Sequence, residues 1–200
     1  FIQPNQSRAI SEWVKQGGVL VLMGNDAGNA EFTHFNILAA NFGITFNNNS
    51  RNHVKDGNLN EATLDIPPGQ AIFKNAGKLF IKENSTLSLK KPAVPLLMND
   101  DEVVIATARY GKGIVFAIGD PWLYNEYIDG RKLPADYDNY EAAAYLVQWL
   151  VTPQVNGKAT AGTATFKNRI VVATDGSGDF KTIQGAINSR AHLVPQQTQQ

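Results

Sequence analysis

The side chains best suited to chemistry gather in one polar and aromatic stretch that follows the apolar segment 114–118. Its members are Asp120, Trp122, Tyr124, Asn125, Glu126, Tyr127, Asp129 and Arg131. Aromatic rings cover the apolar face of a sugar ring, while carboxylates and amides fix its hydroxyl groups. Arg131 can pair in bidentate fashion with a sugar carboxylate. The stretch predicts carbohydrate binding; the alternative is a loop whose aromatics pack over a sheet edge and whose Asp120 caps a turn before Pro121.

A second polar group stands at a comparable place in the chain. Asn25 and Asp26 follow the apolar run 19–23, just as Asp120 follows 114–118. In open α/β sheets, ligands bind beyond the carboxyl ends of the strands. If these two strands are parallel, both groups face one crevice. The predicted binding residues are Asn25, Asp26, Asp120, Trp122, Tyr124, Asn125, Glu126 and Arg131.

The same residues allow a catalytic alternative. Residues 24–28 have the spacing of a nucleophile elbow with Asp26 at its centre, and His34 could act as the base. Asp26 and Asp120 could also form a carboxylate pair for acid–base catalysis. These assignments describe an independent hydrolase. Against them, glycine commonly ends strands, and His34 also suits an ordinary position at the start of a helix.

The sequence offers few residues that could bind a metal ion or a cofactor. The chain has no cysteine, which excludes disulfides, thiolate-bound zinc, iron–sulfur clusters and a thiol nucleophile. His53 and His192 lie in polar loops without the spacing of metal ligands. We therefore expect neither a metal nor a cofactor.

Charge and hydropathy narrow the class of protein. Eighteen Lys and Arg balance eighteen Asp and Glu among 200 residues, so nothing favours binding to nucleic acid or to an anionic membrane surface. Hydrophobic residues make up 43% of the chain, enough for a packed core. No apolar run reaches the ~18 residues that would span a bilayer. The first residues carry neither an initiator Met nor a signal peptide, which predicts a processed product or a fragment.

The elements that must position these residues follow from local patterns. A helix is expected from Pro4 and Asn5 to Lys15, a strand over 19–23, a helix whose face includes Phe35 and Phe42, and a strand over 44–46. This alternation, with continuous apolar runs, is typical of a parallel sheet covered by helices. The expected fold is α/β, three-layered and flavodoxin-like, with its first strand missing.

The second half of the chain shows a hairpin and a helix. Segments 103–110 and 114–118 flank a Gly-Lys-Gly turn, which predicts a β-hairpin. Asp138 precedes a further helix, and Glu141 stands three residues later with the spacing of a capping box. A stretch rich in Gly, Ala and Thr follows and predicts a linker.

The segment 171–187, which reads VVATDGSGDFKTIQGAI, resembles the opening of pectinesterases (pectin methylesterases). The resemblance implies a strand, a turn and a helix that begin a right-handed parallel β-helix. The family's catalytic carboxylates, arginine and glutamines lie far downstream of this opening, so this chain does not contain them. The alternative is any glycine-rich turn before a capped helix.

The preceding residues resemble a different family. Residues 13–23, 25–26, 34–36 and 119–131 are similar to a class I glutamine-amidotransferase-like domain. That domain is found beside pectin- and rhamnogalacturonan-degrading enzymes of gut Bacteroidetes. Its amidotransferase relatives use a Cys-His-Glu triad, which a chain without cysteine cannot form.

Together these patterns predict three segments: an accessory domain over 1–151, a linker over 152–166, and the start of a pectinesterase over 167–200. The first is expected to be a non-catalytic, carbohydrate-binding or assembly domain of a secreted or periplasmic enzyme. Its partners would be a pectin or rhamnogalacturonan-type polysaccharide and the downstream pectinesterase domain. The independent hydrolase and a purely structural or oligomerisation domain remain the alternatives.

Overall fold

The computed structural model describes residues 2–121, 127–128, 131–152 and 181–182. The chain divides into two compact units, residues 1–159 and 160–200. The fold described below is that of the first unit. The linker predicted over 152–166 and the pectinesterase-like segment over 167–200 lie almost wholly outside the described residues.

The N-terminal helix α1 (Pro4–Lys15) forms where the sequence predicts it. Pro4 occupies its first turn, and the side chains and backbones of Gln3 and Gln6 cap each other reciprocally. After the helix, Gly17 adopts a φ of 122°, a backbone conformation that residues with a Cβ rarely adopt. The chain can therefore turn directly into strand β1 (Val19–Met23).

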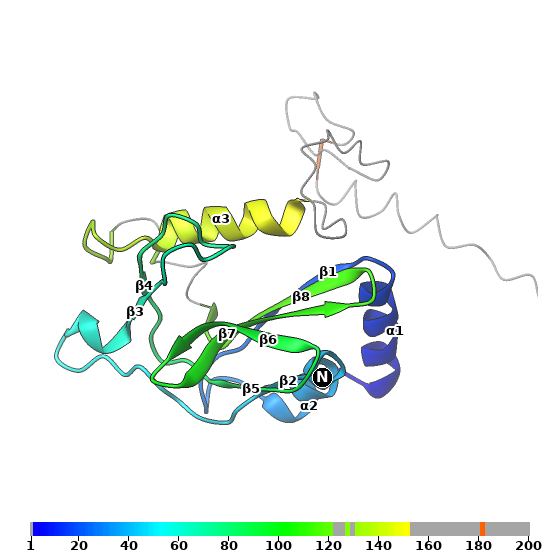
Figure 1. The fold of residues 1–200 in the computed structure, drawn as a ribbon. Coiled ribbons are helices and arrows are strands. Elements are labelled where there is room, and N and C mark those ends of the chain that lie inside the picture. Colours follow the sequence, from blue (N-terminus) through cyan, green and yellow to red (C-terminus); the bar gives the residue numbers. More distant parts are fainter. Residues whose placement is uncertain (1, 122–126, 129–130, 153–180, 183–200) are drawn as a thin grey trace, which may run out of the picture. The chain divides into compact units, whose positions relative to one another are not determined.

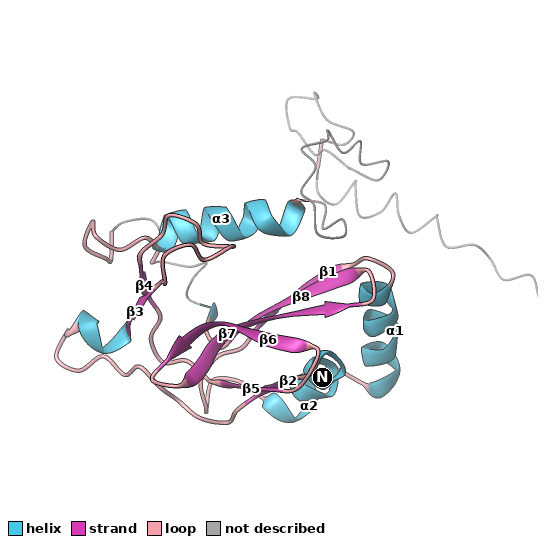
Figure 2. Ribbon diagram, in the orientation of Figure 1, coloured by secondary structure: helices cyan, strands magenta, loops and turns pink. Residues whose placement is uncertain are grey.

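Six strands form the large sheet, drawn as a curled ribbon in Figure 2. Their order is β1-β8-β7-β5-β2, and β6 pairs with β7 beside this path. The remaining strands are β2 (Ile44–Phe46), β5 (Leu87–Leu89), β6 (Ala93–Asn99), β7 (Glu102–Tyr110) and β8 (Gly113–Ile118). Only β1 and β8 run parallel; the other pairs of this sheet are antiparallel.

The expected three-layer, flavodoxin-like α/β fold is therefore wrong. Strand β8 arrives through a hairpin that pairs Tyr110 with Gly113, so it runs against β7. Every residue of β8 is buried, whereas β1 lies at one end of the strand order and buries only Leu22 fully. The apolar run 19–23 thus marks an outer strand of a mostly antiparallel sheet, not the middle of a parallel one.

The two faces of β8 serve two different cores, because successive side chains of a strand point to opposite faces. Val115 and Ala117 pack with Val14 of α1 and with Leu38 of α2 (Phe32–Ala39). Phe116 and Ile118 pack instead with residues of α3 (Asn139–Val151), among them Ala142 and Leu146. Figure 1 shows α1 and α2 apart from α3, with the sheet between them.

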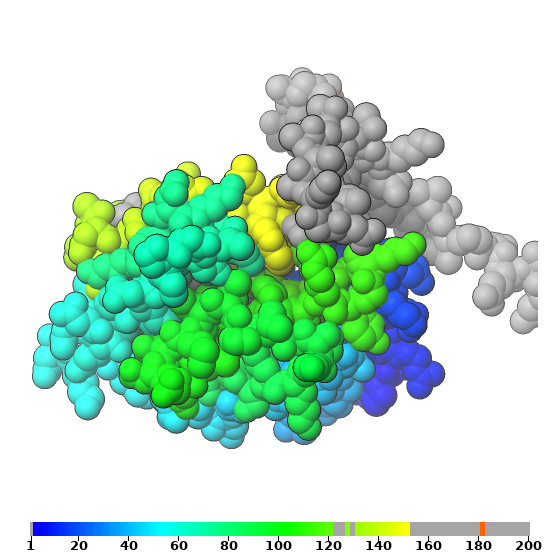
Figure 3. Space-filling model, in the orientation of Figure 1, coloured from blue at the N-terminus to red at the C-terminus, as the bar shows by residue number. Residues whose placement is uncertain are grey.

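The segment that precedes β4 completes the core around α3. Ile72 and Phe73 are buried with Ala142, and Lys74 and Asn75 reach Gln148 and Tyr145 of the helix. Figure 3 shows this segment and α3 as neighbouring surfaces. It leads into a small antiparallel sheet of β3 (Thr63–Asp65) and β4 (Lys78–Phe80).

The asparagine-rich segment is ordered by side-chain amides. Asn47 and Asn49 both donate to the hydroxyl of Thr86, at 2.8 and 2.9 Å, and the side-chain amide oxygen of Asn49 accepts from the Thr86 N–H at 3.0 Å. These bonds hold residues 47–49 against the chain that enters β5. Two short 3-10 helices, η1 (Ala40–Phe42) and η2 (Leu59–Ala62), complete the described elements.

Within the described residues, no helix combines the length and the hydrophobicity that crossing a membrane requires.

Candidate functional site

The segments that carry Asn25 and Asp26, and Asp120, follow β1 and β8 at the same edge of the sheet. Met23, the last residue of β1, pairs with Ile118, the last residue of β8. Just beyond this pair, the Gly24 N–H donates to the Ile118 carbonyl oxygen at 2.8 Å. The two strands are parallel neighbours, so the condition on which the predicted crevice depended is met.

A hollow of about 310 Å³, here called the strand-end hollow, lies at this edge. It is lined by Met23, Gly24, Asn25, Asn29, Ala30, Glu31, Phe35 and Pro121. Of the predicted binding residues, Asn25 belongs to this lining, whereas Asp26 and Asp120 do not.

Asp26 is engaged inside the protein. Its side chain is part of a residue only 7% exposed, and its two carboxylate oxygens accept hydrogen bonds from Asn29 at 2.7 Å and Ser50 at 2.8 Å. A nucleophile needs an oxygen directed toward the substrate. These bonds give Asp26 a structural role, holding the loop after β1 against the asparagine-rich segment.

Asp120 is fully buried, at 0% exposure. The preceding residue, Gly119, lies so close to Ser85 that a Cβ at this position would overlap the Ser85 carbonyl oxygen. The Gly119 carbonyl oxygen accepts from the Ser85 N–H at 3.0 Å. Asp120 therefore belongs to a tightly packed crossing of two chain segments, and Pro121 after it reaches the hollow.

His34 belongs to the cap of helix α2. The Glu31 carboxylate accepts from the N–H groups of Thr33 at 2.9 Å and His34 at 3.1 Å, and the His34 ring nitrogen Nδ1 lies 2.8 Å from it. The backbone N–H of His34, more than any other group, lowers the pKa of Glu31 to about 2. This geometry is that of a helix N-cap, and the His34 ring is engaged with the carboxylate that forms the cap.

The remaining predicted residues divide into two groups. Trp122, Tyr124, Asn125 and Glu126 lie outside the described residues. Arg131 is described and exposed, and it is not among the lining residues of the strand-end hollow.

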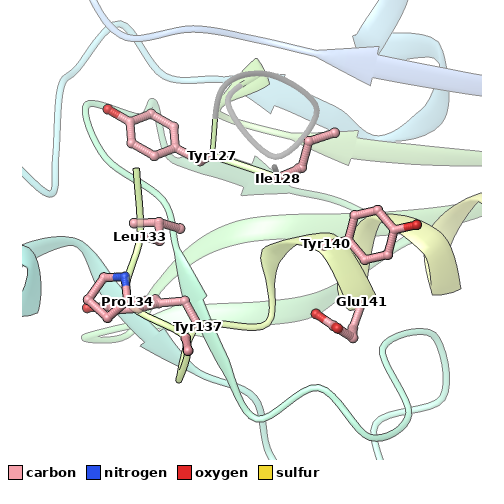
Figure 4. A pocket seen from close by; sticks show the side chains of 8 residues that line it. Tyr127, Ile128, Leu133, Pro134, Tyr137, Tyr140 and Glu141 are labelled. Carbon is pink, nitrogen blue, oxygen red and sulfur yellow. The ribbon is translucent and has the colours of Figure 1, made fainter. Parts of the chain in front are cut away.

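A larger hollow of about 520 Å³, here called the tyrosine pocket, follows the same aromatic stretch (Figure 4). It is lined by Tyr127, Ile128, Leu133, Pro134, Ala135, Tyr137, Tyr140 and Glu141. Figure 4 shows Tyr140 and Glu141 extending from the first turn of α3, across the hollow from Tyr127, Leu133 and Pro134. Tyr140 is 64% exposed to solvent.

Phe80 supports the tyrosine pocket from behind. It is 1% exposed, and its ring centre lies 4.9 Å from that of Tyr127 and 6.0 Å from that of Tyr137. The Tyr137 hydroxyl lies 2.7 Å from the Thr63 hydroxyl. Ring contacts at these separations are favourable, and they fix two of the three tyrosines in place.

The first turn of α3 is tied to β4. The buried Asn139 accepts the Phe80 N–H at 2.9 Å and donates to the Phe80 carbonyl oxygen at 3.0 Å. The capping box predicted for Asp138 and Glu141 is wrong, because Asp138 makes no side-chain cap. Its carboxylate accepts instead from the N–H groups of Gly77 at 2.7 Å and Lys78 at 3.1 Å.

Two lysines flank the pocket's tyrosines. Lys78 Nζ lies 4.1 Å from the ring centre of Tyr137 and 2.6 Å from an Asp136 oxygen, and the hydrogen bond to Asp136 raises the pKa of Lys78. Lys82 Nζ lies 5.9 Å from the ring centre of Tyr127 and 3.3 Å from Glu83. Each ammonium group thus contacts a carboxylate beside a ring.

None of the lining residues of the tyrosine pocket was among the predicted binding residues, and those with side chains suited to binding are Tyr127, Tyr137, Tyr140 and Glu141. The sequence carries a signal for them, since its aromatic stretch extends past Arg131 to Tyr140. Across the described part of the chain, no group of three or more His, Asp or Glu side chains is placed to hold a metal ion.

Comparison with known proteins adds information on the fold alone. No family model matches the chain, and no curated protein matches it. The mmIFT52 N-terminal domain aligns with a TM-score of 0.61 and 19% identity, over 78% of this chain and 74% of that one. A cytoplasmic protein of Salmonella typhimurium LT2 aligns with a TM-score of 0.52 and 13% identity, over 74% of this chain and 60% of that one. These neighbours give no support to a flavodoxin-like fold.

A third alignment is weaker. A cold-adapted β-galactosidase from Rahnella sp. R3 aligns with a TM-score of 0.47 and 15% identity, and the chain spans only 20% of that enzyme. A likeness at this level supports no inference about this protein.

Proposed function

We propose that residues 1–151 form a non-catalytic accessory domain that binds carbohydrate, within a pectin-degrading enzyme whose pectinesterase part continues beyond this chain. The observation that carries the proposal is the tyrosine pocket, which presents Tyr127, Tyr137 and Tyr140 around one hollow. The resemblance of residues 171–187 to pectinesterases supplies the class of polysaccharide.

The pocket has the chemistry that sugar binding requires. Its volume of about 520 Å³ falls within the ~300–1,000 Å³ of typical small-ligand sites, and its lining is mainly aromatic and aliphatic. Tyrosine rings cover the C–H face of a pyranose, and hydroxyl and carboxylate groups at their margins accept or donate hydrogen bonds. The ligand would be a pectin or rhamnogalacturonan-type chain.

Binding is favoured over catalysis because the candidate catalytic groups are occupied elsewhere. Both oxygens of Asp26 accept hydrogen bonds from neighbouring side chains, and His34 contacts the carboxylate that caps its own helix. Loss of turnover on Asp26→Asn in an otherwise stable protein would instead favour the independent hydrolase. A secreted or periplasmic location follows from the proposal, because the polysaccharide lies outside the cytoplasm.

Affinity electrophoresis in gels containing pectin or rhamnogalacturonan tests the proposal. Retardation of the whole chain is expected in one of these gels, and Tyr140→Ala should weaken it strongly. Trp13→Ala is the matched control, since Trp13 is 52% exposed on α1 and lies outside the pocket. Equal mobility in gels with and without polysaccharide would contradict the proposal.

One observation favours assembly as a second candidate function. Tyr140, Val147 and Val151 of α3 are 64, 51 and 62% exposed. Their spacing of seven and four residues places them on one face of the helix. Sedimentation at several protein concentrations tests this alternative. A concentration-dependent dimer that Val147→Glu disrupts, without any binding to polysaccharide, would favour an oligomerisation domain.

A further inference from the structure

The tyrosine pocket has an uneven distribution of charge. Among its described lining residues, Glu141 is the one with an ionisable acidic or basic group apart from the tyrosines. Glu141 is exposed, and Figure 4 shows it extending from α3 beside Tyr140 and facing the hollow. A carboxylate in this position makes the mouth of the pocket unfavourable for an anion.

Two of the nearby cations are already paired with other carboxylates. Lys78 Nζ lies 4.1 Å from the ring centre of Tyr137, and Lys82 Nζ lies 5.9 Å from that of Tyr127. The two lysines contact Asp136 at 2.6 Å and Glu83 at 3.3 Å, so each forms a pair of zero net charge. Arg131 and Lys132 precede Leu133 in the same segment, and both have interaction partners of their own. Neither is among the lining residues.

From this arrangement we infer that the tyrosine pocket selects methyl-esterified galacturonate over ionised galacturonate. The inference rests on the proposed function, because it assumes a pectin chain in the pocket. A free uronate would bring a second carboxylate close to Glu141, and like charges about 4 Å apart in a water-exposed mouth weaken binding about three- to tenfold. An ester is neutral, and its methyl group can pack on Ile128, Leu133 and the rings.

This selectivity would tie the domain to the state of the polymer. Hydrolysis of the ester consumes a water molecule, releases methanol and a proton, and leaves a carboxylate on the galacturonate. The domain would therefore hold its enzyme on unreacted stretches and release it from stretches already de-esterified. The galacturonate carboxylate that the reaction produces would be repelled by the carboxylate of Glu141.

The test compares the binding of the whole chain to two homogalacturonans of equal length, one highly methyl-esterified and one fully de-esterified. At low ionic strength, affinity should be about three- to tenfold higher for the esterified polymer, and the difference should shrink as salt is added. Glu141→Gln should lower the ratio of the two affinities, because the de-esterified polymer gains more from the loss of this charge than the esterified one does. Glu12→Gln is the matched control, because Glu12 is exposed on α1, outside the pocket.

The outcomes separate this inference from the proposal on which it rests. If neither polymer binds, the proposed function fails and the inference fails with it. If both bind equally, or if the de-esterified polymer binds more tightly and Arg131→Ala removes that preference, pectin binding stands and the inference is overturned. An unchanged selectivity in Glu141→Gln would also overturn it.

Discussion

The strand-end hollow and the tyrosine pocket use polar residues in opposite ways. At the strand ends, Asp26 and Asp120 are 7 and 0% exposed, and Asp26 holds the loop that follows β1. At the tyrosine pocket, Tyr140 and Glu141 are exposed while Phe80 and Asn139 support them from within. In this molecule, therefore, the strand-end carboxylates are buried within the fold, whereas Tyr140 and Glu141 face solvent.

The difference follows from the free energy of burying polar groups. A buried carboxylate must be hydrogen-bonded, so a loop that buries one is organised around satisfying it. The two carboxylate oxygens of Asp26 accept bonds from Asn29 and Ser50. Such a residue contributes to the stability of the loop and has little capacity left for a ligand.

Among the substitutions that distinguish the two hollows, Phe80→Ala should change stability most, because it removes the ring that contacts Tyr127 and Tyr137. Truncating a phenylalanine that is 1% exposed should lower the free energy of unfolding by about 3–5 kcal/mol, measured by urea denaturation. Phe80→Leu keeps part of the volume and should cost less. If Phe80→Ala had the same urea midpoint as the wild type, the placement of Tyr127 and Tyr137 would not depend on packing against Phe80.

Asp26→Ala should separate a structural role from a chemical one. It removes two hydrogen bonds of a nearly buried carboxylate and should lower the free energy of unfolding by about 2 kcal/mol. Binding to polysaccharide should stay unchanged at temperatures where the variant is folded. Asn29→Ala, which removes one of the two bonds, should cost less. Weaker binding in folded Asp26→Ala would move the site to the strand-end hollow.

Tyr140→Ala should show the reverse pattern. Because Tyr140 is 64% exposed, its removal should change the free energy of unfolding by less than about 0.5 kcal/mol. Losing one ring that stacks on a sugar should weaken binding by about 1–1.5 kcal/mol, close to tenfold, in calorimetric titrations. A variant that binds as well as the wild type would show that this ring does not contact the ligand.

The smallest effect concerns Glu31 and is visible only as a pH dependence. Hydrogen bonds, above all from the His34 N–H, lower the pKa of Glu31 from 4.5 to about 2. The stability that this carboxylate contributes should be complete above pH 4.5 and should be lost as the pH falls toward 2. The difference in urea midpoint between the wild type and Glu31→Gln should therefore shrink over that range. A difference independent of pH would exclude this cap as its origin.

Local patterns in the sequence predicted individual elements well. The helix after Gln3, the strand over 19–23, the hairpin at Gly111 and Lys112, and the helix after Asp138 all form where they were expected. Each depends on neighbouring residues: a proline in a first turn, a glycine that permits an unusual φ, or a regular apolar spacing.

The arrangement of the strands could not be predicted in the same way. Val19 pairs with Ile114, and β5 lies between β2 and β7, so the partners are distant in the sequence. A continuous apolar run does not show whether a strand is central or outer, or which direction its neighbour takes. The hairpin at Gly111 is a local signal for antiparallel pairing, but it does not show where β7 and β8 lie within the sheet.

None of the residues that line the tyrosine pocket was among the predicted binding residues, although Tyr127 belongs to the aromatic stretch singled out in the sequence. The aromatic stretch led to Tyr127, but the sequence alone does not show that Tyr137 and Tyr140 face the same hollow. One hydrogen bond that Asp26 accepts comes from Ser50, 24 residues away, so local sequence could not predict the burial of Asp26. Asp138 and Glu141 have the spacing of a helix cap, yet the Asp138 carboxylate accepts hydrogen bonds from the backbone N–H groups of Gly77 and Lys78, where the chain enters β4.

The paired hydrogen bonds between Asn139 and Phe80 have a kinetic consequence. They join residues 59 positions apart, so making them closes a long loop that contains most of the large sheet. The hairpin of β7 and β8 closes over a few residues and should form much earlier during refolding. Protection of the Phe80 amide from hydrogen exchange would then mark the last stage of folding, when the tyrosines come together.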